Sequence, residues 1–521
     1  MIGATVHETA RSFRSLGSSR WQALVALAVV GGIAPRVWVY RSALGIPDSD
    51  EAVVGLMARH FSNGELTTFF WGQDYGGSQE VLLTVPVFWV GGSSWLTLRL
   101  VPIVLSAIAA LVVWRVGRRT IGEPAAVVAG CVAWIWPPFA IYKLTHQWGF
   151  YASGMLYAAL LLLLTLRMVE RPSRIRVASF GLVVGLSIWQ SVQLVPIALT
   201  AIVWAGWKQP SLLRRLPLAA TLAVIGALPS IVWNAQHDWG SLESPIENTT
   251  SYEHRLRIFV SPLLPMLLGL RTPFTQERLL PGVLGLLVYA GIALLFLYGA
   301  YSARRRDVSL VYAVAAVFPF VYAFAPQTLF SQEPRYLVVL SAVLVLLLVQ
   351  VASSYWRGAA VIGVAAALSI ATLSRMETYF RTVPVQPPVA PRELGPLVST
   401  LDRLGLDRVY ADFWLAYVLT FATDERIIAA QNKFERVGLV GGQAIPSRHP
   451  FIRHRQYERD VEAARHGFVF FRASIARGAD RTPGDEADER VAQLQSFVGE
   501  LAGYGYQPVE VGSFVVYAPP T

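Results

Sequence analysis

The sequence has few of the features that most classes of soluble enzyme require. Its 521 residues include a single cysteine, Cys131, and only 15% are charged, whereas about a quarter of the residues are charged in an ordinary soluble domain. One cysteine excludes an intrachain disulfide. The sequence also contains no Gly-x-x-x-x-Gly-Lys-Ser/Thr phosphate loop, no His-Glu-x-x-His motif and no Cys/His metal pattern. Nucleotide-driven transport and zinc-hydrolase chemistry are therefore not indicated.

The chain instead contains long runs of apolar residues. Hydrophobic residues make up 54% of the chain, and the mean hydropathy is +0.46. A helix needs about 20 mostly apolar residues to cross the hydrocarbon core of a membrane. Apolar segments that fit such spans lie near residues 21–39, 98–114, 124–141, 150–166, 177–192, 194–207, 216–233, 281–299, 308–325, 336–352 and 359–373. The sequence therefore predicts a mostly α-helical, polytopic membrane protein with about 11 transmembrane helices.

The net charge of +10 reflects how basic residues are distributed over the loops. Alternate loops contain 17 basic residues and only four acidic ones. The basic residues are Arg11/Arg14/Arg20, Arg115/Arg118/Arg119, Arg167/Arg171/Arg174/Arg176, Lys208/Arg214/Arg215, Arg304/Arg305/Arg306 and Arg357. Positively charged loops face the cytoplasm, so we expect a cytoplasmic N-terminus and an extracytoplasmic C-terminus. The pattern predicts a multi-pass protein of a bacterial plasma (inner) membrane, in contact with membrane lipids, and gives no reason to expect a nucleic-acid partner.

Three outward segments are too long to be simple turns: about 41–97, 234–280, and everything after about 374. We expect residues 1–380 to form a transmembrane catalytic module, and the proline-rich residues 381–396 to form a linker. Residues 397–521 are expected to form a small extracytoplasmic α/β domain. Within it, strand-like runs lie at 408–413, 467–471 and 514–518, and helical spacing appears at 397–404 and 489–501.

The first outer loop opens with acidic residues directly after the first span. Asp48, Asp50 and Glu51 precede apolar positions with helical spacing from Val53 to Phe61, which predicts a short amphipathic helix at the membrane surface. One interpretation is a capping box, with Asp48 as the N-cap. The other is that Asp50 serves as a general base for a hydroxyl acceptor. The two are compatible, because a helix N-terminus is a rigid place for a base.

A polar and aromatic stretch follows in the same loop. Glycines within 71–80 give backbone freedom, and flat aromatic rings of this kind stack on sugars. The candidate substrate-binding side chains are Trp71, Gln73, Asp74, Tyr75 and Glu80. The alternative interpretation is an interfacial aromatic belt with a turn.

A basic N-terminus, one span and then an outer loop bearing Asp50-Glu51 resemble the GT-C superfamily of polyprenyl-phosphate-sugar glycosyltransferases. The chain looks most like the protein O-mannosyltransferase-like family 39 and its bacterial relatives, whose Gly-Gln-x-Tyr-x-Gly-Ser-x-Glu stretch resembles Gly72 to Glu80. The resemblance implies inverting transfer from a polyprenyl-phosphate sugar donor to a glycan, lipid or protein acceptor. It implies Asp50 as the catalytic base, and we expect Glu51 to orient the base or the acceptor. Asp48 and Asp50 together have the Asp-x-Asp spacing of metal-using relatives, so a divalent cation is a candidate cofactor.

A lipid-phosphate donor requires cations at the outer surface, and several outer ends carry suitable side chains. These are Lys143 and His146 after the third span, Arg257 in the second long loop, and Arg335 with Tyr336 before the tenth span. Arg335-Tyr336-Leu337 also resembles the family's Arg-Tyr-Leu, which implies that Arg335 contacts the donor phosphate. Snorkelling at the headgroups is the alternative for Arg335 and Lys143, a solvated helix face is the alternative for Arg257, and a structural role is the alternative for His146. Two other functions stay open: a flippase of lipid-linked sugars, and a non-catalytic assembly protein with an outer sensor-like domain.

Overall fold

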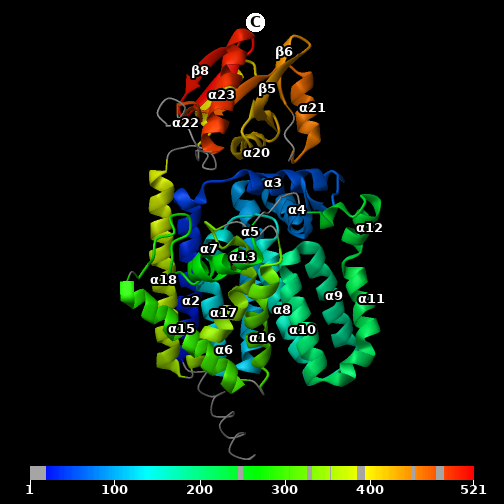
Figure 1. Cartoon of the computed structure of the whole chain (residues 1–521), viewed down its shortest axis with the longest axis vertical. Coiled ribbons are helices and arrows are strands. Elements are labelled where there is room, and N and C mark those ends of the chain that lie inside the picture. Colours follow the sequence, from blue (N-terminus) through cyan, green and yellow to red (C-terminus); the bar gives the residue numbers. More distant parts are fainter. Residues whose placement is uncertain are drawn as a thin grey trace, which may run out of the picture. The chain divides into compact units, whose positions relative to one another are not determined.

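The computed structural model describes residues 19–243, 250–280, 282–303, 306–325, 331–352, 354–383, 393–447, 452–476 and 486–520. These residues form two compact units, which Figure 1 shows with their elements labelled. Several sequence predictions lie outside the described residues. They concern Arg11, Arg14, Arg304, Arg305 and most of the proline-rich linker.

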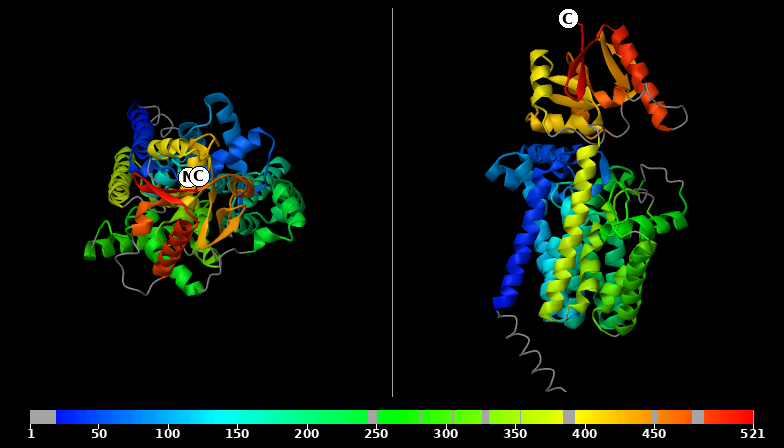
Figure 2. Two further views of the ribbon diagram at one scale, coloured as in Figure 1. Left: turned by 90° about the horizontal axis from the view of Figure 1, so that it is seen from above. Right: turned by 90° about the vertical axis from the view of Figure 1, so that its left-hand side faces the viewer.

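Unit 1 contains Met1–Leu44, Asp74–Glu80 and Arg99–Tyr379, and it is built mostly from helices. Its longer helices run alongside one another (Figure 2). In chain order its elements are α2 (Ser19–Arg41), η1 (Ala43–Gly45), α5 (Trp95–Thr120), α6 (Glu123–Ile135), α7 (Pro138–Lys143), α8 (Tyr151–Glu170), α9 (Arg174–Gln190), η2 (Val192–Leu194), α10 (Val195–Lys208), η3 (Pro210–Arg215), α11 (Leu216–Gly226), α12 (Leu228–Gln236), η4 (Gly240–Leu242), α13 (Tyr252–Ile258), η5 (Phe259–Leu263), α14 (Leu264–Leu267), α15 (Gly282–Ala303), α16 (Ser309–Tyr322), η6 (Arg335–Leu340), α17 (Ser341–Leu348), η7 (Val349–Val351) and α18 (Tyr355–Thr382). The residues at the ends of three of these helices, Gly45, 95–98 and 380–382, fall in unit 2.

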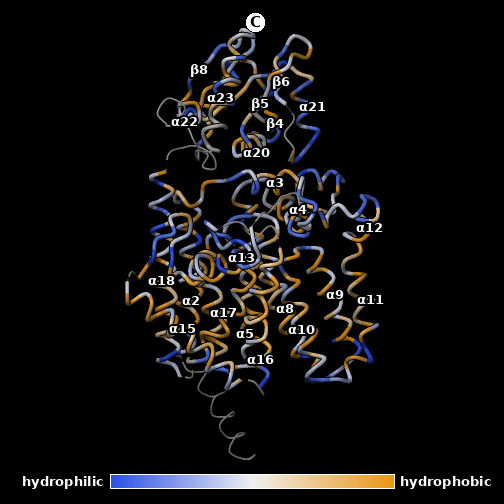
Figure 3. The backbone as a smooth tube through the Cα atoms, viewed as in Figure 1, coloured by the Kyte–Doolittle hydropathy of each residue, from blue (hydrophilic) through white to orange (hydrophobic). Residues whose placement is uncertain are grey.

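Each of the eleven apolar segments falls on one of these helices or on consecutive ones. Among the described residues, five helices are long and apolar enough to cross a membrane, or six if the bent pair formed by η3–α11 and α12 is one span. The 64° bend of that pair lies just before α12, which begins at Leu228 and has Pro229 in its first turn. Figure 3 shows apolar residues along most of the helices of unit 1. The mostly helical class is therefore confirmed, whereas the number of spans and their direction stay predictions.

Small residues allow two of these helices to pack closely. A Cβ atom at Gly185 of α9 would lie 2.0 Å from the carbonyl oxygen of Ala223 on α11. Helix pairs in membranes use such small residues to bring their backbones together, and α9 and α11 lie side by side in Figure 1. The glycine therefore sets the spacing of this pair.

Unit 2 contains Gly45–Gln73, Val81–Leu98 and Phe380–Thr521. Its elements are α3 (Ser49–Ser62), β1 (Phe69–Phe70), α19 (Gly395–Arg403), β3 (Arg408–Ala411), α20 (Phe413–Ala422), β4 (Ile428–Gln431), β5 (Lys433–Val440), β6 (Gln443–Ser447), α21 (Arg455–Ala463), β7 (Gly467–Phe471), α22 (Arg472–Ala476), α23 (Glu486–Gly503), β8 (Gln507–Val511) and β9 (Phe514–Ala518), together with parts of β2 (Gln73–Gly77) and α4 (Gln79–Gly91). The five-stranded sheet has the order β4-β3-β7-β9-β8. β3 is parallel to β4 and β7, and β9 is antiparallel to β7 and β8.

The α/β composition of the C-terminal residues agrees with the sequence. The predicted strands 467–471 and 514–518 are confirmed as β7 and β9. The strand predicted at 408–413 ends at Ala411, because the side chain of Asp412 accepts a hydrogen bond from the Trp414 N–H and caps α20.

The core of unit 2 includes part of the predicted first outer loop. α3 contributes residues such as Val53, Leu56 and Met57, each fully buried, to the apolar cluster that also contains Val409 and Phe468 of the sheet. The helix was expected to rest one apolar face on the membrane. Instead, Ala52 to Ala58 are all buried, so α3 is an internal helix of unit 2. The division of the chain by its contacts therefore groups 45–73 with the C-terminal residues, whereas the sequence placed them in separate domains.

Candidate active site

Asp50 lies in the first turn of α3, directly after a defined cap. Asp48 has extended backbone angles, and its Oδ1 accepts a hydrogen bond from the Glu51 N–H at 2.9 Å. This confirms Asp48 as the N-cap. The Glu51 side chain is completely buried, and its role in orienting the base or the acceptor stays a prediction. The cap fixes the backbone from which the Asp50 side chain emerges.

The Asp50 carboxylate pairs with an arginine that lies far away in the sequence. Asp50 Oδ1 accepts a hydrogen bond from Arg453 Nη2 at 2.9 Å, across a separation of 403 residues. The Asp50 side chain is 26% exposed and that of Arg453 only 9%. The pair is therefore a charge-assisted contact in which the carboxylate alone remains open to solvent.

Arg453 is held by its surroundings. Its guanidinium carbon lies 5.4 Å from the ring centre of Phe70 and 5.3 Å from that of Phe413, distances typical of cation–π contacts. Its backbone N–H donates to the hydroxyl of Tyr417 at 2.9 Å. Burial raises the pKa of Tyr417 to about 12, so this hydroxyl keeps its proton. These contacts fix Arg453 just before α21.

The same guanidinium holds the loop at 71–73. Arg453 Nη1 donates to the carbonyl oxygens of Gly72 and Trp71 at 3.2 and 3.4 Å. With the Gln73 amide oxygen turned toward Arg453, this oxygen accepts from Nη2 at 2.7 Å and from Nη1 at 3.0 Å. Because amide orientation is assigned from hydrogen bonding, this orientation is the one that satisfies both groups. One side chain thus links the acidic motif with the glycine-containing motif.

Gly72 is the residue that lets this loop approach Arg453. Its φ of +64° lies in the left-handed region, and a Cβ atom there would lie 2.9 Å from the Ile452 carbonyl oxygen. Gly72→Ala should therefore move the loop and lower the turnover of the sugar transfer that the sequence resemblance implies by about 10-fold to 100-fold. Gly64→Ala is the matched control, because Gly64 also has a positive φ, of +89°, but a Cβ there meets nothing within 4 Å. Equal turnover numbers (kcat) for the two variants would show that the close approach is unimportant.

Trp71 has a different environment from the one predicted. Its ring stacks on His454 at 4.1 Å with an interplanar angle of 18°, and it meets His60 edge-on at 5.0 Å. The side chain is buried, and His454 occupies one face of the ring that was expected to stack on a sugar. Trp71 is a packing residue of unit 2 in this structure.

His60, at the C-terminal end of α3, lies in a titratable cluster of unit 2. Its Nδ1 is 2.6 Å from Glu65 Oε2, and its Nε2 is 3.1 Å from Glu425 Oε2. Burial lowers the pKa of His60, but the hydrogen bonds and charges of Glu425 and Glu65 outweigh it, and the pKa is raised overall. Neighbouring His454 has its pKa lowered to about 4, by burial and then by the charge of His60. The two histidines therefore prefer opposite charge states.

This cluster predicts a pH-dependent stability. A histidine whose pKa is raised in the folded state contributes to the free energy of unfolding. This contribution is complete below the ordinary histidine pKa of about 6.5, and it disappears as the pH rises through the raised pKa. Wild type should therefore exceed His60→Gln in stability by about 1 kcal/mol near pH 6 and by less near pH 8.5. Thermal unfolding at the two pH values measures this difference. A gap that widens with rising pH would contradict the assignment.

Glu80, a predicted substrate-binding residue, lies inside unit 1. Its Oε1 accepts hydrogen bonds from the N–H and the Oγ of Ser153 at 2.8 and 2.6 Å. Ser153 is in the first turn of α8, where free N–H groups favour an acceptor with negative charge. Burial raises the pKa of Glu80, against the lowering effect of its hydrogen bonds from Ser153, Ala152 and Gln147. Glu80 therefore anchors the start of α8.

Asp74 and Tyr75, also in unit 1, are the remaining polar and aromatic candidates of this stretch. Asp74 is exposed and Tyr75 is half-buried. Burial raises the pKa of Asp74, and the charge of His237 lowers it in part. These two side chains keep solvent-accessible surface in unit 1, unlike Glu80.

Lys143 and His146 are both buried in unit 1. Lys143 Nζ lies 3.5 Å from the ring centre of Trp148 and 4.7 Å from that of Tyr151. The ring of His146 also stacks on Trp148, with the ring centres 4.4 Å apart, and His146 Nε2 lies 2.9 Å from the carbonyl oxygen of Leu44. The environment of His146 is that of a structural histidine. Contact of Lys143 with a phosphate stays a prediction.

The other predicted cations differ in their surroundings. Arg335 begins η6 and forms an ion pair with the buried Glu333, and Tyr336 beside it is half-buried. Arg257 is an exposed residue of α13. Arg335 is therefore the better positioned of the two arginines, since the ion pair orients it.

The two predicted metal ligands point to separate partners. Asp48 accepts from the Glu51 N–H, and Asp50 pairs with Arg453. Within the described residues, no three His, Cys, Asp or Glu side chains come together in a way that could hold a metal ion. The divalent cation stays a prediction, which a chelator added to an activity assay would test.

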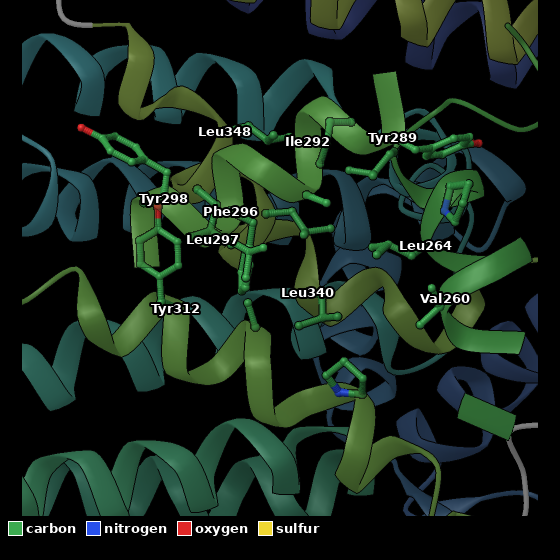
Figure 4. A pocket seen from close by; sticks show the side chains of 18 of the residues that line it. Val260, Leu264, Tyr289, Ile292, Phe296, Leu297, Tyr298, Tyr312, Leu340 and Leu348 are labelled. Atoms are coloured by element: carbon green, nitrogen blue, oxygen red, sulfur yellow. The ribbon is translucent and has the colours of Figure 1, made fainter. Parts of the chain in front are cut away.

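Unit 1 also contains a large apolar cavity of about 1170 Å³. Figure 4 shows side chains that line it, including Tyr289, Ile292 and Phe296 of α15 and Leu340 of η6. Three arginines, Arg271, Arg278 and Arg306, also line it, whereas the predicted phosphate contacts do not take part in it. The cavity could take a long apolar molecule with an anionic end.

The sequence matches no protein-family model and no curated protein. Among solved structures, the chain is similar to ArnT from Cupriavidus metallidurans in the apo state, with a TM-score of 0.62 and 14% identity over 96% of this chain and 100% of ArnT. ArnT bound to undecaprenyl phosphate matches with a TM-score of 0.57 and 14% identity, over 97% of this chain and 100% of ArnT. The chain therefore shares its fold with ArnT. The resemblance predicted from the acidic pair and its position is confirmed at the level of the fold.

Sequence reasoning did not identify Arg453 as a functional residue. It stands in a segment rich in charge, Arg453-His454-Arg455-Gln456-Tyr457, which is typical of an exposed helix start. A usable signal was the aromatic and arginine content of this segment in a domain otherwise poor in functional motifs. Its partner could not be deduced, because the contact joins two distant segments.

Proposed function

We propose that this protein is an integral-membrane, inverting glycosyltransferase. It takes a sugar from a polyprenyl-phosphate donor and transfers it to a hydroxyl group of a glycan, lipid or protein on the outer face of the membrane. The observation that carries the proposal is the Asp50 carboxylate, paired through Oδ1 with Arg453 and 26% exposed at a capped helix start.

The chemistry requires one group that accepts a proton. As the acceptor hydroxyl attacks the anomeric carbon, its proton passes to the Asp50 carboxylate, and the bond between that carbon and the phosphate oxygen breaks. The products are the glycosylated acceptor and polyprenyl phosphate. A positioned carboxylate within hydrogen-bonding reach of the hydroxyl can supply this function. Arg453 contacts one oxygen, and among the described residues no hydrogen bond to Oδ2 is formed, which leaves that oxygen for the proton.

The fold and the cavity support a lipid-linked donor. ArnT, which shares the fold, has been solved with undecaprenyl phosphate bound. The apolar cavity of unit 1 has the volume and lining expected for an isoprenoid chain, and Arg271 and Arg278 offer positive charge at its wall. Lys143 and Arg335 remain the candidates for contact with the donor phosphate.

Reconstitution into vesicles separates this function from the alternatives. Purified protein would be given a synthetic polyprenyl-phosphate sugar and extracted envelope acceptors, and the release of polyprenyl phosphate would be followed by mass spectrometry. We expect acceptor-dependent consumption of the donor. A flippase would move the donor across the bilayer without consuming it, and a non-catalytic protein would leave it in place; either result would reject the proposal.

A further inference from the structure

We propose that Arg453 is a positioning residue for the base and that the C-terminal residues thereby supply part of the catalytic apparatus. The inference rests on the proposed function, because it assigns Arg453 a role through Asp50. It goes further in one respect: the α/β portion of unit 2 is required for the chemical step and is more than a support or an acceptor-binding module.

The first argument is the geometry of the guanidinium. Nη2 reaches Asp50 Oδ1, while Nη1 reaches the backbone carbonyls of the 71–73 loop, and the Gln73 amide oxygen accepts from both. Arginine presents five N–H donors in a rigid planar arrangement, whereas lysine presents a compact ammonium group. Only arginine can hold the carboxylate and the loop in fixed relative positions with one side chain.

The second argument is rigidity. A free arginine side chain would lose about 2 kcal/mol of rotamer entropy on taking up a single conformation. Here the rings of Phe70 and Phe413 flank the guanidinium, and the hydroxyl of Tyr417 fixes the backbone. The conformation is therefore set before any substrate binds, which is what a pre-organised site requires.

The third argument distinguishes positioning from substrate binding. The Arg453 side chain is only 9% exposed, so little of its surface is open to a donor phosphate. Its Nε is buried and has no hydrogen-bond partner among the described residues. The open group of the pair is the carboxylate of Asp50, which is the group that must meet the acceptor.

The control for a test lies in the same unit. Arg59 lies on α3, the helix that carries Asp50, and its side chain is 15% exposed. It forms an ion pair with Asp424 at 2.6 Å, and its guanidinium carbon lies 4.3 Å from the ring centre of Phe421. Arg59→Ala therefore removes a comparable arginine that packs against an aromatic ring and pairs with an acid. Any effect of Arg453→Ala beyond that of Arg59→Ala is specific to its place beside Asp50.

The experiment measures donor consumption by the full-length variants in vesicles. Arg453→Ala should lower kcat about 100-fold and leave the KM for the donor within about twofold, because a base out of position slows the chemical step alone. Arg453→Lys should retain an intermediate kcat. Millimolar guanidinium ion should restore part of the kcat of Arg453→Ala and none in Arg59→Ala. In an Asp50→Asn background, Arg453→Ala should cause little further loss.

Three results would overturn the inference. They are a kcat for Arg453→Ala equal to that of Arg59→Ala, a raised KM with unchanged kcat, and a complete lack of guanidinium rescue. If Arg453→Ala fails to fold, as judged by its melting temperature, Arg453→Lys decides by the same criteria. Should Asp50→Asn retain full activity, the proposed role of Asp50 fails; should Asp50→Asn be inactive while Arg453→Ala is normal, only the inference about Arg453 fails.

Discussion

Asp50→Asn is expected to lower the rate of sugar transfer by about 10²-fold to 10⁴-fold, the range supplied by general-base catalysis. Asparagine has nearly the same shape, and its amide oxygen can still accept the hydrogen bond from Arg453 Nη2. It cannot take up the proton of the acceptor hydroxyl. The melting temperature should therefore change little while kcat collapses.

Asp424→Asn is the matched control for this substitution. Asp424 also pairs with an arginine of unit 2, Arg59, at 2.6 Å, but its side chain is 80% exposed. Loss of an exposed ion pair costs at most about 1 kcal/mol of stability, and transfer should continue at the wild-type rate. Comparable activity of Asp50→Asn and Asp424→Asn would remove Asp50 from the mechanism.

Glu80→Ala should have the largest effect on stability among the proposed variants, a loss of about 3 kcal/mol. The substitution leaves the N–H and hydroxyl groups of Ser153 buried without their acceptor, at the helix end where N–H groups are already unsatisfied. Glu80→Gln should cost much less, because its amide oxygen can still accept from Ser153. Thermal unfolding of the reconstituted protein compares the two variants.

Glu123→Ala is the corresponding control for a helix start in unit 1. Glu123 is the first residue of α6, and it pairs with Arg118 at 2.6 Å with its side chain 17% exposed. Its loss should lower stability by about 1 kcal/mol at most. If Glu80→Ala is no less stable than Glu123→Ala, the role of Glu80 as an anchor of α8 is wrong.

Local sequence signals predicted the local structure well. Asp48 was expected to cap a helix because its side chain precedes an apolar pattern with helical spacing, and the cap is present. The strand-like, apolar and aromatic runs at 467–471 and 514–518 predicted β7 and β9 to the residue. Each of these features depends on neighbours within a few positions, so the sequence contains the information that determines it.

Long-range contacts could not be predicted in this way. The apolar residues of α3 have the same pattern whether they rest on lipid or on α20, and only the fold shows that they are buried in unit 2. A tryptophan in a glycine-containing loop is typical of a site that stacks on sugars, yet the ring of Trp71 stacks on His454. The contact of Arg453 with Asp50 joins residues 403 positions apart, and no periodicity relates them. The candidate base was therefore predictable, whereas the residue that positions it was not.

The stereochemistry of transfer tests the central claim most directly. A donor labelled with carbon-13 at the anomeric position would be incubated with the reconstituted protein and its acceptor, and NMR would report the configuration of the product. A single displacement assisted by Asp50 predicts inversion at the labelled carbon, together with release of polyprenyl phosphate. Retention of configuration, or a donor that stays intact, would contradict the account.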